Sequence, residues 1–291
     1  MTDVREDLTG RVVAVFNTGS GSCDASSESH ARKIFAGAGL HGVEIHVVDP
    51  ANIGNALKTA VVSADVLVVL GGDGTIGSAA SLCGVSGPYL IPLPGGTMNM
   101  LPKALYGPVD WQSALKATLA RPKSKNVSGG DAEGHRFYCA AILGAPSLWA
   151  DAREAARDGD LIEAAKRAVT ATRRSLSDAI EYEFGDMTGS AEAVAVICPL
   201  ISQDMDCEDA ALEAVALDPN SAASLFGLAF HAAFDGWRND ASVTRAKVRC
   251  VAVRAHGEIP VILDGEKVQI EREVRITFLP RAFQAIVPST V

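Results

Sequence analysis

The stretch Ala64-Asp65-Val66-Leu67-Val68-Val69-Leu70 runs directly into Gly71-Gly72-Asp73-Gly74-Thr75, so that an apolar run breaks into a glycine-rich turn. A continuous run of valine and leucine is typical of a strand buried on both faces, as in a parallel sheet covered by helices. The turn then lies at the carboxyl end of that strand. Because glycine has no β-carbon, the N–H groups around Gly71, Gly72 and Gly74 can come close to an anion. The stretch therefore predicts a site for a nucleotide phosphate.

Two other side chains in this turn have candidate roles. Asp73 is its only charge, and a carboxylate beside a polyphosphate is repelled unless it binds a cation or accepts a proton. Asp73 is therefore a candidate for binding magnesium or for acting as a general base. Thr75 is placed to cap the next helix, whose amino end would face the same anion. The alternative is an ordinary strand-to-helix turn with a solvated aspartate.

Composition limits the classes of protein that fit. The chain has 291 residues, 48% of them apolar, which suits one large or two ordinary domains. A formal net charge of -9 argues against a nucleic-acid partner. Six scattered cysteines without a C-x-x-C pair predict reduced thiols and a cytoplasmic protein. No apolar run approaches the ~20 residues that cross a bilayer, so we expect any membrane contact to be peripheral, at the inner surface.

The order of elements before and after the opening stretch predicts the first domain. Residues 11–16 form a second buried-strand candidate, a helical pattern covers 26–38, and residues 43–48 form another strand. Strand, helix, strand, helix, strand is the order of a doubly wound parallel α/β unit. In such sheets the ligand lies beyond the carboxyl ends of the strands, so turns that follow neighbouring strands share one edge.

Two more turns are expected at that edge. Asn17-Thr18-Gly19-Ser20-Gly21-Ser22 follows the first strand, and Pro94-Gly95-Gly96-Thr97-Met98-Asn99 follows a short strand that begins at Tyr89. The first turn could contact phosphate through N–H groups and hydroxyls, although a plain loop fits equally well. Asn99 could hydrogen-bond a ligand or cap its own turn.

A second domain follows the polar, proline-containing stretch Arg121–Lys125. We expect domains at 1–125 and 126–280, with the tail from about 280 to 291 packing back on the first. The strand candidates beyond the boundary are short and predict a mainly antiparallel, β-rich domain: residues 137–144, 180–184, 192–198, 247–253, 259–263 and 274–278.

Two helical patterns lie among these strands. The region 149–180 carries a basic stripe that could touch anionic lipid headgroups, although a solvated helix face is the more ordinary interpretation. Residues 221–237 carry an aromatic stripe, Phe226, Phe230, Phe234 and Trp237, which fits core packing better than an acyl-chain pocket.

The three turns together resemble the catalytic domain shared by bacterial diacylglycerol kinases, sphingosine kinases and ceramide kinases. The first turn matches the family's Asn-Pro-x-Ser-Gly motif with Thr18 in place of proline. Near the end of the chain, Asp264-Gly265-Glu266 by itself predicts a hairpin turn. It also resembles the family's Asp-Gly-Glu motif, whose glutamate faces the nucleotide across the cleft between two domains. Glu266 is the matching residue.

The resemblance implies an ATP-dependent lipid kinase that transfers the γ-phosphate to a hydroxyl of diacylglycerol or of a ceramide or sphingoid lipid. It implies ATP and Mg²⁺ as cofactors, with the ATP site in the cleft between the domains. Asp73 and Glu266 would be catalytic, Asp73 would also contact the metal, and either could be the general base. The ATP-binding residues would be Asn17, Ser20, Gly21, Gly71, Gly72, Gly74, Thr75, Gly96, Thr97 and Asn99.

One departure from the family bears on the substrate. Bacterial diacylglycerol kinases usually have an aspartate after the asparagine of the third turn, where this chain has Met100. The nearest candidate for a supporting second carboxylate is Asp131. Sphingosine kinases also have an apolar residue at this place, so a ceramide or sphingoid base stays open as the acceptor. The alternatives are a NAD kinase, whose typical second motif is not found here, and a non-catalytic nucleotide-binding protein.

Overall fold

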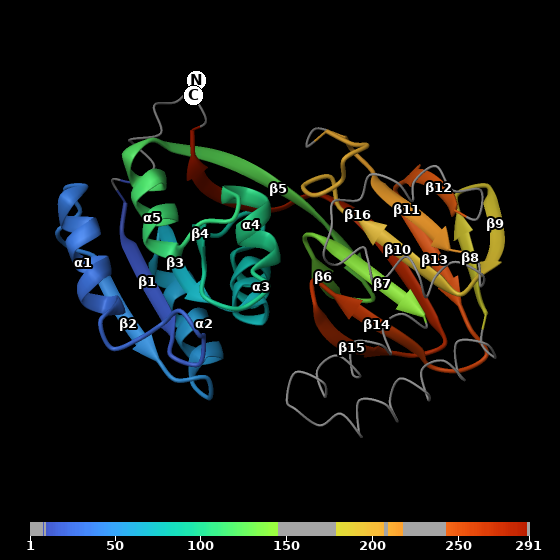
Figure 1. Ribbon diagram of the computed structural model, residues 1–291, viewed down its shortest axis with the longest axis horizontal. Helices are drawn as coiled ribbons and strands as arrows, with labels where there is room; N and C mark the ends of the chain where they lie inside the picture. The colour runs from blue at the N-terminus through green and yellow to red at the C-terminus, as the bar shows by residue number, and fades with distance from the viewer. Residues whose placement is uncertain (1–7, 9, 145–178, 207–208, 218–242, 290–291) are drawn as a thin grey trace. The chain divides into compact units, whose positions relative to one another are not determined.

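The computed structural model describes residues 8, 10–144, 179–206, 209–217 and 243–289 (Figure 1). The chain divides into two compact units, residues 1–129 with 280–291, and residues 130–279. The two predicted helical patterns, with their basic and aromatic stripes, fall on 145–178 and 218–242 and so lie outside the described residues. Within the described part, no helix is long and apolar enough to cross a membrane.

The first unit contains a parallel sheet of strands in the order β2-β1-β3-β4, joined at its β4 edge by the end of β16. The bounds are β1 Val12–Asn17, β2 Glu44–Val48, β3 Val66–Gly71 and β4 Tyr89–Pro94. Every residue of β1 and β3 is buried, as their unbroken apolar runs predict. The doubly wound α/β fold is confirmed.

Helices cover both faces of this sheet (Figure 1). The helix α1 (Ser27–Gly37) packs beside α5 (Trp111–Ala120), and both bury apolar residues on one face of the sheet. There the rings of Phe16 and Trp111 lie with centroids 5.9 Å apart. On the other face α2 (Ile53–Ser63) packs beside α3 (Asp73–Cys83). The short α4 (Met100–Tyr106) follows the third turn.

The second unit has two antiparallel sheets that enclose one core. One sheet has the order β12-β11-β10-β7-β14-β15, and the other contains β13, β8 and β9 with the first part of β16. The bounds are β6 His135–Phe137, β7 Ala140–Gly144, β8 Ile180–Phe184, β9 Met187–Ala191, β10 Ala193–Ile197, β11 Leu212–Leu217, β12 Val243–Val248, β13 Cys250–Arg254, β14 Ile259–Leu263 and β15 Glu266–Ile270. The mainly antiparallel, β-rich class is confirmed.

Two strands carry residues of both units, namely β5 (Pro122–Ala132) and β16 (Glu273–Pro288). The division between the units falls after Gly129, inside β5, and residues 280–291 belong to the first unit. The polar stretch at 121–125, interpreted as a boundary, is therefore mostly the start of a strand. Its proline stands at the first strand position, where a missing N–H is tolerated.

Three other predicted strands differ from the structure. Residues 247–253 are divided at Arg249 between β12 and β13, which belong to different sheets. Residues 137–144 break at Tyr138 and Cys139, between β6 and β7. The predicted strand at 274–278 is part of the 16-residue β16. Local patterns do not show where a chain passes from one sheet to another, because both sheets favour the same residue types.

Candidate active site

The structure brings the three predicted turns together at the carboxyl edge of the parallel sheet. The Ser22 N–H donates to the Gly95 carbonyl at 3.0 Å, and the Gly95 N–H donates to the Gly71 carbonyl at 2.9 Å. The Asn17 Nδ2 donates to the Thr75 Oγ1, also at 2.9 Å. Each turn is thus hydrogen-bonded to the other two. We call this group of turns, residues 17–22, 71–75 and 94–99, the three-turn edge.

Asn17 organises the first of these turns. The residue is 9% exposed, and its Oδ1 accepts the Gly19 N–H at 2.9 Å. Its carbonyl accepts the Ser20 hydroxyl at 2.7 Å and the Ser20 N–H at 3.1 Å. The chain therefore folds tightly at Asn17 and returns to solvent at Gly21, which is exposed.

The helix after the second turn starts earlier than expected, and the predicted capping role of Thr75 is wrong. The helix α3 begins at Asp73, with Gly72 in an extended conformation at the cap position. Thr75 is therefore already in the first helical turn, where its hydroxyl accepts the Asn17 amide instead. Gly72 can supply the extended cap because glycine is among the better residues there even without a side-chain acceptor.

The Asp73 carboxylate connects the second turn to the third. Its Oδ2 accepts the Asn99 N–H at 2.9 Å, and its Oδ1 accepts the Met100 N–H at 2.6 Å. Asn99 has a left-handed backbone with φ of 51°, and Met100 is the first residue of α4. Asp73 therefore caps the amino end of a helix distant in sequence. The sequence carries no signal for this link, which spans 26 residues.

The Asn99 side chain caps its own turn, which was one of the two predicted roles. Its Oδ1 accepts the Gly96 N–H and its Nδ2 donates to the Gly96 carbonyl, both at 2.7 Å. The residue is 9% exposed. An amide group has two N–H donors, so one of them remains for a ligand.

The glycines of the three-turn edge fall into two groups. A β-carbon on Gly71 would lie 2.6 Å from the Thr75 Cβ, one on Gly95 would lie 2.9 Å from the Gly71 N and O atoms, and one on Gly96 would lie 2.8 Å from the Gly72 Cα. These three glycines let the turns pack together. A β-carbon on Gly72 would meet nothing closer than 3.8 Å, and one on Gly21 would meet nothing within 4 Å. Gly72 and Gly21 therefore leave open space beside the backbone.

The possible metal ligands are few. Among the described residues, no group of three or more His, Cys, Asp or Glu side chains could hold a metal ion. Asp131, the suggested second carboxylate, accepts the Gly134 N–H at 2.8 Å in the tight turn between β5 and β6. Asp73 alone could thus contribute a carboxylate at the three-turn edge. This arrangement fits a Mg²⁺ ion held mainly by phosphate oxygens and water, which is usual for that ion.

The Asp264-Gly265-Glu266 segment lies in the second unit and forms the predicted hairpin turn. Asp264 and Gly265 have φ of 47° and 91°, and they join β14 to β15, where Leu263 pairs with Glu266. Positive φ at both turn residues is typical of a type I′ turn, for which Asp-Gly is a preferred pair.

Asp264 also holds the break between β6 and β7. Its carboxylate accepts the N–H groups of Tyr138, Cys139 and Ala140 at 2.6, 2.8 and 2.9 Å. Burial, and next the Asp264 charge, raise the pKa of the buried Cys198 thiol. These contacts explain why the predicted strand at 137–144 is interrupted.

Glu266 differs from its neighbour Asp264 in having no side-chain partner among the described residues. Its side chain is exposed and forms no hydrogen bond or ion pair with a residue that the structure describes. The motif therefore consists of a structural aspartate and an available glutamate.

Comparison with known proteins shows that the segment with the three-turn edge is similar to one family. Residues 11–131 match the family model of the diacylglycerol kinase catalytic domain. The family resemblance is confirmed. All three turns lie within the matched segment, whereas Glu266 lies beyond it.

Solved structures agree on the fold. The chain is similar to the crystal structure of a diacylglycerol kinase from Bacillus anthracis str. Sterne, with a TM-score of 0.68 and 17% identity over 95% of this chain and 96% of that one. A second protein from the same organism, provisionally assigned the same activity, gives a TM-score of 0.71 and 19% identity over 95% and 97% of the two chains. At these identities the similarity concerns the fold alone.

Proposed function

We propose that the protein is an ATP-dependent lipid kinase that phosphorylates a hydroxyl of diacylglycerol or of a ceramide or sphingoid lipid. The observation that carries this proposal is the three-turn edge. Three glycine-rich turns are hydrogen-bonded together at the carboxyl ends of parallel strands, inside the segment that matches the kinase family. Ligands of doubly wound sheets bind at this edge.

Backbone N–H groups would hold the phosphates of ATP in this proposal. Gly21 and Gly72 leave space for an anion, and Gly72 caps α3, whose amino end carries a partial positive charge. Of the ten residues predicted to bind ATP, none is cationic. Magnesium bound with ATP would supply the positive charge that phosphoryl transfer requires.

The two motif carboxylates would have different roles. Both Asp73 oxygens already accept N–H groups, so we propose that Asp73 chiefly positions the third turn and reaches the metal through water. Glu266, whose side chain has no partner among the described residues, is proposed as the general base. It would take the proton of the lipid hydroxyl as that oxygen bonds to the γ-phosphorus. The bond from the γ-phosphorus to the bridging oxygen breaks, and ADP leaves.

The acceptor is tested by a comparison of lipids. The full-length protein is incubated with Mg²⁺ and γ-labelled ATP in mixed micelles that contain diacylglycerol, ceramide or sphingosine, and the lipid products are separated. We expect label in at least one lipid. Transfer to NAD but to no lipid would replace the proposal with a NAD kinase. Binding of ATP without transfer to any acceptor would indicate a non-catalytic protein.

The role of Glu266 is tested with a matched pair of variants. Glu266→Gln should reduce the rate of lipid phosphorylation by about 10²-fold or more, because a general base contributes typically 10²–10⁴-fold. Glu258→Gln is the control, since Glu258 is also exposed in the second unit but stands outside the motif. Equal rates for the two variants would show that Glu266 is not the base.

A further inference from the structure

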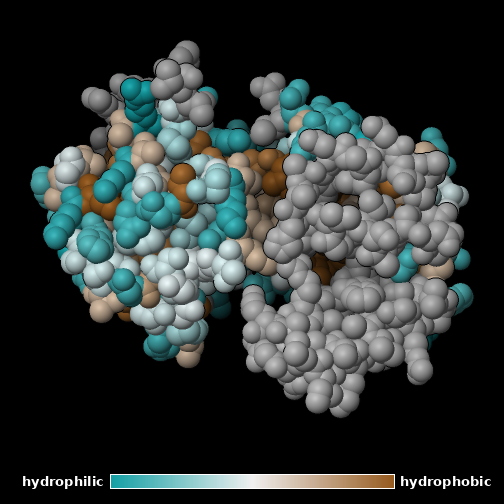
Figure 2. All heavy atoms as spheres, in the orientation of Figure 1, coloured by the Kyte–Doolittle hydropathy of each residue, from teal (hydrophilic) through white to brown (hydrophobic). Residues whose placement is uncertain are grey.

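A groove with a cationic mouth lies between α1 and α5, on the first unit. It has a volume of about 640 Å³ and is lined by Lys33 and His30 from α1, by Lys116 from α5, and by the buried Ile34 and Leu119. Figure 2 shows hydrophobic patches bordered by hydrophilic residues over the region where Figure 1 draws these two helices. The groove therefore combines exposed cations with an apolar floor.

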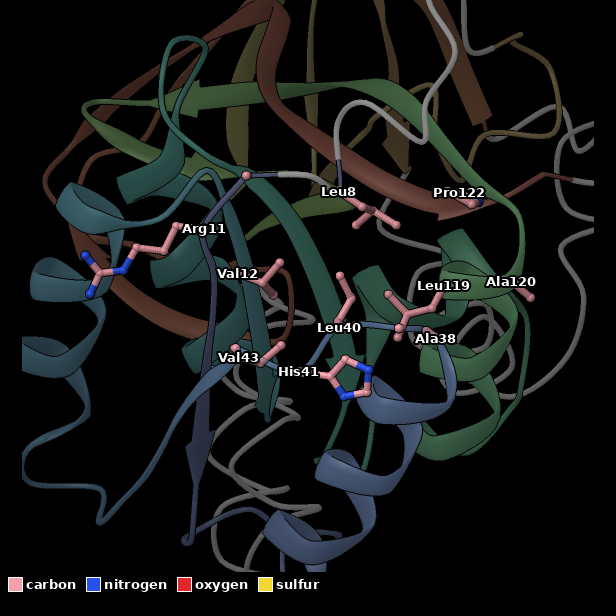
Figure 3. Close-up of a pocket in the computed structure, with 13 residues that line it drawn as sticks. Leu8, Arg11, Val12, Ala38, Leu40, His41, Val43, Leu119, Ala120 and Pro122 are labelled. Atoms are coloured by element: carbon pink, nitrogen blue, oxygen red, sulfur yellow. The ribbon is translucent and has the colours of Figure 1, made fainter.

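A second pocket continues from this groove, lined by apolar side chains together with Arg11 and His41. It has a volume of about 720 Å³. In Figure 3, Leu8, Val12, Leu40, Val43 and Leu119 gather around it, while the Arg11 side chain points away. The Arg11 guanidinium instead pairs with Glu44 at 2.8 Å. Ala38, Leu119 and Ala120 line both hollows, so one continuous wall joins the groove to the second pocket.

We call the groove and the second pocket together the double pocket. The charged side chains of described residues that line it are all basic. Among the described residues, no aspartate or glutamate lines either hollow, although the whole chain has a formal net charge of -9. Lys33 and Lys116 are both exposed, and neither forms an ion pair with a described residue. Two unpaired ammonium groups on neighbouring helices attract an anion that can lie between them.

The double pocket is separate from the three-turn edge. Val12, which lines it, begins β1, whereas Asn17 ends that strand. Five residue steps of about 3.3 Å place them roughly 16 Å apart. A ligand here would bind at the amino end of the sheet, away from the turns proposed to hold ATP.

We infer that this double pocket binds an amphiphile with an anionic head and a hydrocarbon chain. The head would lie between Lys33 and Lys116, and the chain would follow Leu119 toward the apolar side chains of the second pocket, Leu8, Val12, Leu40 and Val43. Pockets of this volume, mostly apolar with a few placed polar groups, are the usual form of small-ligand sites. The inference does not depend on the proposed kinase activity, because it concerns a different edge of the sheet and is tested by binding.

Calorimetric titration of the full-length protein tests the ligand class. The probes are dodecyl phosphate, dodecanoate, dodecyltrimethylammonium and inorganic phosphate, with the amphiphiles below their micellar concentrations. Saturable binding of the anionic amphiphiles is expected. Stronger binding of dodecyl phosphate than of dodecanoate would identify a phosphate head, and the reverse a carboxylate. Equal binding of the cationic amphiphile would overturn the inference, and so would equal binding of inorganic phosphate, which needs no apolar pocket.

Two kinds of variant locate the ligand. Lys33→Gln with Lys116→Gln should weaken binding of the anionic amphiphiles about fivefold or more, since exposed ion pairs each contribute modestly to binding. Lys58→Gln on α2 is the matched control and should bind normally. Ala38→Trp, at an exposed position of the shared wall, should block the chain without disturbing the core. Unchanged binding in both the double lysine variant and Ala38→Trp would show that the ligand lies elsewhere.

Discussion

The three-turn edge of the first unit and the Asp264 turn of the second unit are stabilised by the same kind of hydrogen bonding. In each, an aspartate from a sequence motif accepts backbone N–H groups of a distant segment: Asp73 accepts two and Asp264 accepts three. They differ in what lies beside the aspartate. Beside Asp73 there is open backbone at Gly72, and beside Asp264 there is the exposed side chain of Glu266.

Within each motif, this difference distinguishes the residue that holds the turn together from the groups that remain available for a ligand. A carboxylate whose oxygens already accept N–H groups holds the turn together, and its loss leaves those donors unpaired. The groups proposed to contact a ligand are the N–H groups near Gly72 and the carboxylate of Glu266. The predictions below test this division.

Asp264→Ala should have the largest effect on stability. It leaves three N–H groups without an acceptor and places alanine at φ of 47°. We expect the free energy of unfolding to fall by about 3 kcal/mol. Hydrogen exchange of the amides at 138–140 should accelerate strongly. Asp264→Asn, which tolerates the left-handed backbone and keeps one acceptor, should be milder. Wild-type exchange in Asp264→Ala would contradict the structural role.

Asp73→Ala should destabilise the first unit less. Two N–H groups, of Asn99 and Met100, lose their acceptor at a partly exposed place, so the expected loss is about 2 kcal/mol. Thermal unfolding measures it. Asp73→Asn keeps one acceptor and should lose about half as much. If Asp73→Ala unfolded at the wild-type temperature, the link between the second and third turns would not exist.

Gly96→Ala should cost about 1–3 kcal/mol, as overpacking does, because its β-carbon would lie 2.8 Å from the Gly72 Cα. Denaturant unfolding measures this loss of stability. The transition is followed by tryptophan fluorescence, to which Trp111 in the first unit contributes. Gly72→Ala is the comparison and should change stability by less. A larger loss of stability in Gly72→Ala than in Gly96→Ala would mean that the two glycines have been assigned to the wrong groups.

Gly77→Ala should have the smallest effect and the opposite sign. Gly77 lies in α3 with nothing within 4 Å of its β-carbon position. Alanine should therefore stabilise the protein by about 0.5–1 kcal/mol. A rise in melting temperature would confirm that α3 tolerates a β-carbon beyond its first turn, and a fall would show an unrecognised contact.

Much of the fold could be predicted from the sequence, because its strongest signals are local. The apolar runs of β1 and β3 and the turns after them are such signals, and so is the Asp-Gly hairpin. The helix start at Asp73 was missed because Gly72 and Thr75 are both acceptable caps. The links made by Asp73 and Asp264 were missed because they join residues 26 and about 125 positions apart, and periodicity carries no information about such pairs. The family resemblance, in contrast, depended on the motifs and their order.

The central claim is that the open backbone at Gly72 receives the phosphates of a nucleotide. Equilibrium binding of Mg-ATP to wild type, Gly72→Ala and Gly77→Ala tests it most directly, since both glycines have room for a β-carbon and only Gly72 belongs to the three-turn edge. We predict that Gly72→Ala weakens ATP binding at least about tenfold, equivalent to about 1.4 kcal/mol, while Gly77→Ala binds as wild type does. Wild-type affinity in a folded Gly72→Ala protein would contradict the claim.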